Sequence, residues 1–219
     1  MRSATASRSE TYARLIRRAR RERVTVPPAL GRSLAQYLDL LLLWNRKINL
    51  TALTDPEEAV DRLLLEPLIA ARHLQTRNGV LVDIGSGGGS PAIPLKLAEP
   101  GLTLHMVESK TRKAAFLHEA VRHLALGSVT VHAARFQELL TKPELHEAAD
   151  VLTIRAVRVD PKVLISLQAF LRPGGSIMLF RGQRREDEAP SAPPPLSFES
   201  SHVLSETLQS CLHIFRKLR

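Results

Sequence analysis

The pattern of apolar and polar positions divides the chain into a helical first third and a longer alternation of short strands with helices. Leucines recur at helical spacing at Leu30, Leu34, Leu38 and Leu41, which predicts a helix with one buried face. From residue 80 onward, short apolar runs are separated by amphipathic segments. Strands that alternate with helices in this way predict an α/β fold with a parallel, doubly wound sheet.

The same pattern gives approximate bounds for the elements after residue 80. Strands are expected at 80–84, 102–108, 129–133, 150–154 and 176–180, and helices after Pro91, at 111–125 and after Pro161. The sequence Arg-Pro-Gly-Gly at 172–175 predicts a turn, and the charged, proline-rich segment 183–196 predicts a mobile loop. Two short strands at 198–204 and 212–216 are expected to close one sheet edge as an antiparallel hairpin.

The chain before the sheet is expected to be mostly helical. Residues 55–58, Asp-Pro-Glu-Glu, combine an N-cap, a proline at the first helical position and acids in the first turn, which predicts a helix start. This helix is expected to reach about residue 73, with a kink near Pro67. Three regions result: a flexible basic tail at 1–27, a helical cap at 28–78, and an α/β domain at 79–219 that forms one globular unit with the cap.

The composition is that of an ordinary globular protein. Of 219 residues, 44% are hydrophobic and 24% charged, and the length suits one domain with an appendage. The chain has no long apolar run and no charged-then-apolar start, so we expect neither a membrane span nor a secretory leader. Cys211 is the only cysteine, so an internal disulfide is impossible, and the cytoplasm is the expected location.

The net charge is strongly positive and unevenly distributed. The formal charge is +9, and residues 1–23 hold eight arginines against Glu10 and Glu22, a net +6. A net positive charge of this size indicates a polyanionic partner. Two interpretations of the basic segment stay open: a solvated tail that maintains solubility, or a non-specific phosphate contact whose affinity falls with salt.

The candidate chemistry begins at the first predicted strand. This strand carries Asp83 near its end and leads into Gly-Ser-Gly-Gly-Gly-Ser at 85–90, where glycines let the backbone approach a ligand closely. The next strand ends in Glu108, where a carboxylate can bind ribose hydroxyls. No Gly-Lys-Ser/Thr follows the loop, which argues against a triphosphate site. The spacing favours S-adenosylmethionine over a dinucleotide but leaves both open, and the glycines alone also fit a simple tight turn.

Several motifs occur in an order that resembles a known family. The sequence D-I-G-S-G-G-G, followed by an acid at the end of the next strand, is similar to motifs I and II of class I S-adenosylmethionine methyltransferases. The matching segments are W-N-R-K-I-N-L-T-A at 44–52, D-I-G-S-G-G-G-S-P-A-I-P at 83–94, V-E-S-K-T-R-K-A-A-F-L at 107–117, I-R-A-V at 154–157 and L-R-P-G-G at 171–175. Together they resemble the glucose-inhibited division protein B family over about residues 30–218.

The resemblance implies a Rossmann-like class I fold and methyl transfer from S-adenosylmethionine to N7 of a guanine in 16S, the small-subunit, ribosomal RNA. The implied partner is this RNA, naked or within the 30S particle, and we expect a monomer without a metal site. Guanine N7 carries a lone pair and no proton, so the enzyme must align the reactants and exclude water but needs no general base. We therefore assign no catalytic acid or base, and the histidines are expected to be structural.

The resemblance also implies roles for individual residues, most of them at the carboxyl ends of strands. The residues implied at the cofactor are Asp83, Gly85, Gly87, Ser90, Glu108, Phe136, Gln137 and Arg155. In this set Glu108 holds the ribose hydroxyls, and Phe136 with Gln137 flanks the adenine. Three residues are expected to contact RNA: Arg46, Lys47 and Asn49. Two residues are expected to help position the reactants: Asn45 and Arg155.

Simpler interpretations of these residues stay open. Asn45 and Asn49 are also typical of turns at helix ends, where their side chains satisfy local backbone groups. Arg155 could be purely an ion-pair partner of Glu108 or Asp83.

The chain departs from the family pattern at several positions. Ser90 stands where Phe or Leu is usual, Ile154 where Ser is usual, and Leu63 where His is usual. These changes are expected to alter the pocket lining and the substrate mouth, and not the reaction class. The Pro-Pro-aromatic motif of amino-methyltransferases is missing, and Cys211 lies in the terminal hairpin, away from the position of a cysteine nucleophile.

Two other functions remain as alternatives. A small-molecule methyltransferase of the same fold would act without regard to RNA or salt, and it would leave the basic tail without a purpose. A non-catalytic RNA-binding assembly factor would bind RNA in a salt-dependent way but would not bind S-adenosylmethionine.

Overall fold

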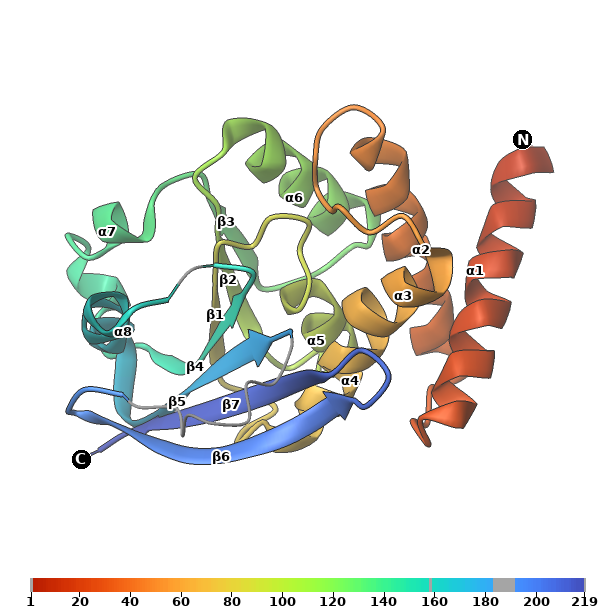
Figure 1. The fold of residues 1–219 in the computed structure, drawn as a ribbon. Coiled ribbons are helices and arrows are strands. Elements are labelled where there is room, and N and C mark those ends of the chain that lie inside the picture. Colours follow the sequence, from red (N-terminus) through yellow and green to blue (C-terminus); the bar gives the residue numbers. More distant parts are fainter. Residues whose placement is uncertain (1, 158, 183–191, 219) are drawn as a thin grey trace.

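The computed structural model describes residues 2–157, 159–182 and 192–218, and in this part of the chain a seven-stranded sheet forms the centre (Figure 1). Its strand order is β3-β2-β1-β4-β5-β7-β6. The strands are β1 (Val80–Ile84), β2 (Thr103–Val107), β3 (Val129–His132), β4 (Ala149–Arg155), β5 (Leu171–Arg181), β6 (Leu196–Ser205) and β7 (Ser210–Lys217). The first five pair in parallel, and β7 runs antiparallel to both β5 and β6. The expected doubly wound sheet with a C-terminal hairpin is confirmed.

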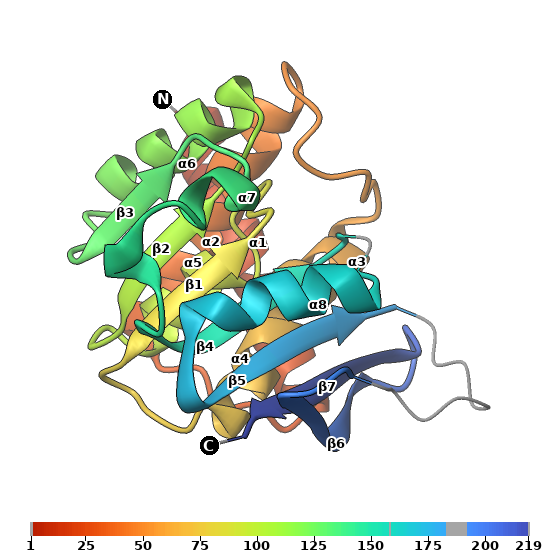
Figure 2. The same cartoon turned by 90° about the vertical axis from the view of Figure 1, so that its left-hand side faces the viewer.

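Helices cover both faces of the sheet (Figure 2). The helices that follow β1 are α5 (Ala92–Ala98), α6 (Thr111–His123), α7 (Phe136–Leu139), η3 (Pro143–Leu145), α8 (Pro161–Leu167) and η4 (Gln168–Phe170). Successive residues of β1 point to opposite faces: Leu81 packs with the core that includes α5 and α6, and Val82 with the core that includes α8. No helix of the described residues combines the length and the apolar character that crossing a membrane requires.

The region before the sheet is helical and packs on the face covered by α5. Its helices are α2 (Pro28–Asn45), α3 (Pro56–Val60), η1 (Asp61–Leu65), α4 (Glu66–Ala70) and η2 (Ala71–His73). Asp55 caps α3 as expected, because its Oδ1 accepts hydrogen bonds from the backbone N–H of Glu57 at 2.9 Å and of Glu58 at 2.7 Å. The leucines of α2 enter the same core as β1, so cap and sheet share one hydrophobic core. The boundary at residues 78–79 stays a prediction.

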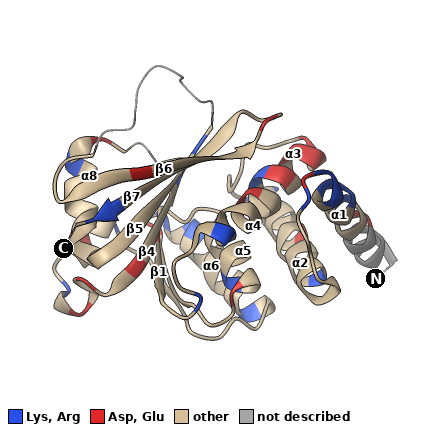
Figure 3. Cartoon of the chain, turned by 90° about the horizontal axis from the view of Figure 1, so that it is seen from below, with Lys and Arg blue, Asp and Glu red and all other residues tan. Residues whose placement is uncertain are grey.

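The basic N-terminal segment differs from the flexible tail that the sequence predicts. Arg2–Arg21 form helix α1, which lies along α2, with Leu15 fully buried and Ala19 nearly so. Arg18 of α1 pairs with Asp61 and Glu57, and Figure 3 shows the cations of α1 beside the acids of α3. The sequence did not predict this packed helix, because its narrow apolar stripe is supplemented by ion pairs to residues about forty positions away, which no local pattern reveals. The flexibility of residues 1–27 stays a prediction.

The structure differs from the sequence-based expectation at two further segments. Residues 172–175, expected as a turn, belong to β5, whose pairing with β4 shifts register between Ala149 and Val151. The shift and the positive φ of Gly174 (81°) bend the strand there instead of ending it. Of the mobile loop expected at 183–196, residues 183–191 lie outside the described residues, and β6 already begins at Leu196.

We expect Arg18→Ala to lower the free energy of unfolding by about 2 kcal/mol, because Asp61, only 4% exposed, would lose its cationic partner. Urea denaturation followed by circular dichroism measures this change. The matched control is Arg20→Ala on the exposed side of the same helix, which should change stability by less than about 0.5 kcal/mol. Equal stability of the two variants would mean that α1 is not held to the cap by this ion pair.

Candidate active site

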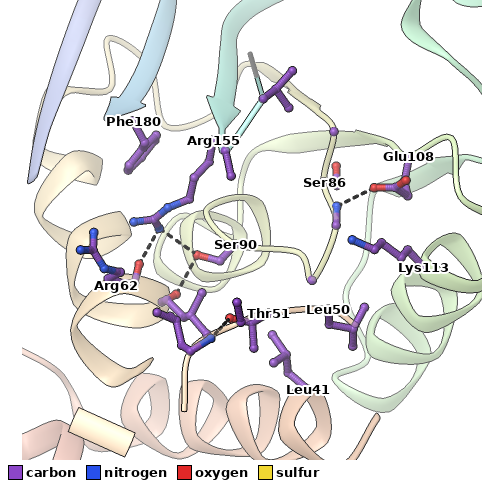
Figure 4. Close-up of a pocket in the computed structure, with 18 of the residues that line it drawn as sticks. Leu41, Leu50, Thr51, Arg62, Ser86, Ser90, Glu108, Lys113, Arg155 and Phe180 are labelled. Carbon is purple, nitrogen blue, oxygen red and sulfur yellow. Dashed lines mark hydrogen bonds between the residues drawn. The ribbon is translucent and has the colours of Figure 1, made fainter. Parts of the chain in front are cut away.

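A pocket of about 650 Å³ opens at the carboxyl ends of β1, β4 and β5 (Figure 4). Five stretches of chain supply most of its lining: 50–53 in the loop between α2 and α3, 62–63 in η1, the glycine loop at 85–90, 155–157 at the end of β4, and 180–182 at the end of β5. Leu41, Glu108 and Lys113 complete it. The strand order reverses between β1 and β4, and a crevice at this switch point is where open α/β sheets bind ligands.

The glycine loop adopts a backbone that other residues could not follow without strain. Gly85 has φ +72°, and a Cβ there would lie 2.6 Å from Cγ2 of Val157. Gly89 has φ +86°, and a Cβ there would lie 2.6 Å from Cδ1 of Ile93. The buried hydroxyl of Tyr37 in α2 donates a hydrogen bond to the Gly88 carbonyl at 2.6 Å, so the cap fixes the loop from outside.

Glu108 is tied to the same loop from the end of β2. Its Oε2 accepts a hydrogen bond from the Gly87 N–H at 2.9 Å, and its Oε1 accepts one from the Lys110 N–H at 2.7 Å. The side chain is 6% exposed and lines the pocket, as does Lys113 on the same side (Figure 4). Each carboxylate oxygen keeps acceptor capacity beyond these two bonds, so Glu108 can accept hydrogen bonds from the hydroxyl groups of a ligand. The structure therefore brings Glu108 together with Gly85, Gly87 and Ser90, as expected.

Asp83 lies beneath the loop and is absent from the pocket lining. Its Oδ1 accepts a hydrogen bond from the Thr153 hydroxyl at 2.6 Å, and its carbonyl accepts one from the Ser86 hydroxyl at 3.1 Å. Burial raises the pKa of Asp83 to about 6, while the hydrogen bond from Thr153 acts in the opposite direction. These contacts make Asp83 a support of the loop, whereas the sequence placed it at the cofactor.

Arg155 lines the pocket at the end of β4, but its ionic partner is neither Glu108 nor Asp83. The guanidinium pairs with Glu66 of α4 and lies over the ring of Phe180, 5.2 Å from its centroid. It also donates to the Arg62 carbonyl and lies 3.3 Å from Ser90 Oγ. Burial lowers the pKa of Arg155, and the charge of Glu66 raises it. The sequence did not single out Glu66, because its partner Arg155 lies 89 positions away.

The carbonyls of residues 62 and 63 are available to the pocket because of Pro67. Proline has no N–H, so neither the i−4 carbonyl of Leu63 nor the i−5 carbonyl of Arg62 can receive a helical hydrogen bond from it. The chain forms a π-helical turn here, with Glu66 N–H donating to the Asp61 carbonyl. Ser90 Oγ instead donates to the Leu63 carbonyl at 2.9 Å, and Arg155 donates to that of Arg62. At the expected kink near Pro67, the helix therefore binds the glycine loop through Ser90 and β4 through Arg155.

The Trp-Asn segment shapes the rim of the pocket. Asn45 Oδ1 accepts hydrogen bonds from the N–H of Leu50 at 2.8 Å and of Thr51 at 3.0 Å, and its Nδ2 donates to the Thr51 carbonyl at 3.0 Å. These bonds support the interpretation of Asn45 as a turn residue that folds 50–53 over the pocket. The side chains of Arg46, Lys47 and Asn49 are exposed and lie outside the pocket lining.

Two residues expected at the adenine also lie outside the pocket lining. Phe136 and Gln137 begin α7, where Phe136 packs against the core under α8 and Gln137 is exposed. Their contact with a cofactor stays a prediction. The sequence did not place Leu41, Phe180 and Arg181 at the pocket, because they reach it from elements far apart in the chain and belong to no motif. It also gave no role to Thr51, although this residue lies in the matching segment 44–52.

Comparisons with known proteins agree on a family. A family model described as rRNA small subunit methyltransferase G, GidB, matches residues 31–214. A protein named ribosomal RNA small subunit methyltransferase G from Xanthomonas campestris pv. campestris strain B100 is 41% identical over 160 residues, 73% of each chain. A protein of the same name from Chloroflexus aggregans is 37% identical over 177 residues, 80% of this chain and 72% of that one.

Solved structures share the fold at low sequence identity. A SAM-dependent methyltransferase from Aquifex aeolicus aligns with a TM-score of 0.55 and 15% identity over 74% of this chain and 93% of that one. A mutant of MtNAS in complex with S-adenosylmethionine aligns with a TM-score of 0.61 and 17% identity over 87% and 78%. These likenesses identify a methyltransferase-type fold, and the match of the family model across most of the chain shows that this protein belongs to the rRNA small subunit methyltransferase G family.

Proposed function

We propose that the protein transfers the methyl group of S-adenosylmethionine to N7 of a guanine in small-subunit ribosomal RNA. One observation carries the proposal beyond family membership. A single cavity joins the glycine loop and Glu108 to Arg155 and Phe180 at the ends of β4 and β5. A cofactor held at the first group and a base held at the second would therefore meet in one space, as alignment for methyl transfer requires.

The residues of the pocket fit this cofactor. Glu108 offers carboxylate oxygens to ribose hydroxyls, and the glycine loop offers backbone without side chains in the way. Leu41 and Leu50 supply apolar walls on which a nucleoside can pack. Bound S-adenosylmethionine supplies an electrophilic methyl group on a cationic sulfur.

The chain's own residues align the reactants and take no proton. Among the described lining residues the only carboxylate is Glu108, and both of its oxygens already accept backbone N–H groups. A neutral guanine N7 presents its lone pair directly, so no base is required. Arg155, fixed by Glu66 and the Arg62 carbonyl, offers its remaining N–H donors to the base or the cofactor.

The proposed RNA contact lies on the rim, where Arg46 and Lys47 stand exposed beside Asn49 on the loop that folds over the pocket. A second exposed basic group, Arg20, Arg21 and Arg23, lies at the end of α1. Such side chains bind phosphates and position an RNA without reading its sequence. We infer that the protein acts as a monomer in the cytoplasm, on naked rRNA or on the 30S particle.

Incubation with labelled S-adenosylmethionine should place label on small-subunit rRNA that lacks the modification. The naked RNA and the 30S particle serve as separate substrates, and mass spectrometry of the digested nucleosides should find 7-methylguanosine. Label on another atom would refute the N7 assignment. No label on either substrate, together with activity on small molecules or RNA binding without cofactor binding, would favour one of the two alternative functions.

Glu108→Gln should weaken the binding of S-adenosylmethionine and of its demethylated product, each by about tenfold or more. The amide loses the charge-assisted acceptance of ribose hydroxyls and turns an N–H toward Gly87 or Lys110. Calorimetric titration measures both affinities. The matched control is Glu119→Gln, a partner of Arg122 on the outer surface of α6, which should bind both ligands like the unmodified protein. Unchanged binding in Glu108→Gln would remove this residue from the site.

The double substitution Arg46→Ala, Lys47→Ala should weaken rRNA binding and reduce the slope of log K against log salt by about 1.5, because two phosphate contacts are lost. Affinity for S-adenosylmethionine should stay the same, since neither residue lines the pocket. Filter binding at several salt concentrations measures the slope. The pair Arg20→Ala, Arg21→Ala serves as the comparison, and an effect confined to that pair would move the RNA contact from the rim to α1.

A further inference from the structure

Glu66 is a buried carboxylate at a junction of three elements behind the pocket. It is 1% exposed and begins α4. Its Oε2 pairs with Arg155 at the end of β4, and its Oε1 accepts a hydrogen bond from Ser210 Oγ at 2.5 Å at the start of β7. Oε1 also lies 3.9 Å from Nη1 of Arg62. One side chain therefore links the cap, the central sheet and the terminal hairpin.

The pocket lining has an excess of positive charge that Glu66 offsets. Four of the described lining side chains are cationic, Arg62, Lys113, Arg155 and Arg181, and only Glu108 is anionic. Arg155 has a largely buried side chain and donates to Ser90 Oγ in the glycine loop at 3.3 Å. Without Glu66 its guanidinium would be an uncompensated charge facing the cavity. Such a charge would repel any cation held against that loop.

We propose that Glu66 is a positioning residue that neutralises Arg155, and that it thereby sets the preference of the pocket for a sulfonium donor over the neutral thioether left after methyl transfer. This inference rests on the proposed function, because it assumes that the pocket holds S-adenosylmethionine. The two ligands differ by one methyl group and one unit of charge. Their relative affinity therefore reports the electrostatics of the site separately from its shape.

The contacts of Glu66 also restrain the orientation of Arg155. The carboxylate holds one side of the guanidinium, and the Arg62 carbonyl and Ser90 hold the other. A purely structural role for Glu66 would affect both ligands alike, since each would meet the same disturbed pocket. A charge role affects the sulfonium alone.

The test compares Kd values for S-adenosylmethionine and S-adenosylhomocysteine by calorimetry in opposite charge variants of the full chain. Glu66→Gln leaves Arg155 without its counter-ion, and the preference for the sulfonium should fall about tenfold. Arg155→Gln removes the cation, so the preference should stay the same or rise. Ser210→Ala removes only a hydrogen bond from an uncharged donor to Glu66 and leaves the carboxylate charge in place. Its preference should match the unmodified protein even where its thermal stability falls.

An unchanged preference in Glu66→Gln, or a fall in both Glu66→Gln and Arg155→Gln, would overturn the inference while leaving the methyltransferase proposal intact. If Glu66→Gln does not fold, Arg155→Gln decides alone, because a lowered preference there contradicts the charge argument. Failure of the unmodified protein to bind either ligand would overturn both this inference and the proposed function.

Discussion

The backbone of residues 85–90 forms the centre of the pocket, and hydrogen bonds to elements on three sides hold it in place. Tyr37 donates to the Gly88 carbonyl from α2, Ser90 donates to the Leu63 carbonyl in η1, and Glu108 accepts from the Gly87 N–H at the end of β2. A loop of glycines has high conformational entropy in the unfolded chain, and such contacts must offset that entropy. The pocket therefore depends on the cap as much as on the sheet.

The irregular helix of the cap is part of the same arrangement. Pro67 removes the donor that would satisfy the carbonyls of residues 62 and 63, and those carbonyls then receive Arg155 and Ser90. In a regular helix these two carbonyls would accept backbone hydrogen bonds from within the helix. The break in the helix thus adds polar contacts between the cap and the carboxyl ends of the strands to the hydrophobic core that cap and sheet share. Glu66 at the next turn supplies the charge that offsets the burial of Arg155.

Positive charge serves two purposes in this chain. Arg14 pairs with Glu10 within α1, whereas Arg17 and Arg18 pair with Glu57 and Asp61, so part of the charge of the N-terminal segment connects α1 to the cap. Arg20, Arg21 and Arg23 stay exposed at the end of the helix, and Arg46 with Lys47 stays exposed on the rim. The net charge alone could not separate these groups, because it does not say which arginine meets an acid in the folded chain.

The sequence by itself determined the elements whose signals are local. Apolar periodicity located the strands, Asp55 marked a helix start, and the glycine loop with Glu108 located the centre of the pocket, because steric preferences and capping bonds act over a few residues. Only the tertiary structure decided that Arg155 pairs with Glu66, 89 positions away, that Arg18 binds α1 to Asp61, and that Asp83 supports the loop from beneath. Such pairings depend on which charged and polar groups the packed elements bring together, and a short stretch of sequence does not show which distant residues will meet.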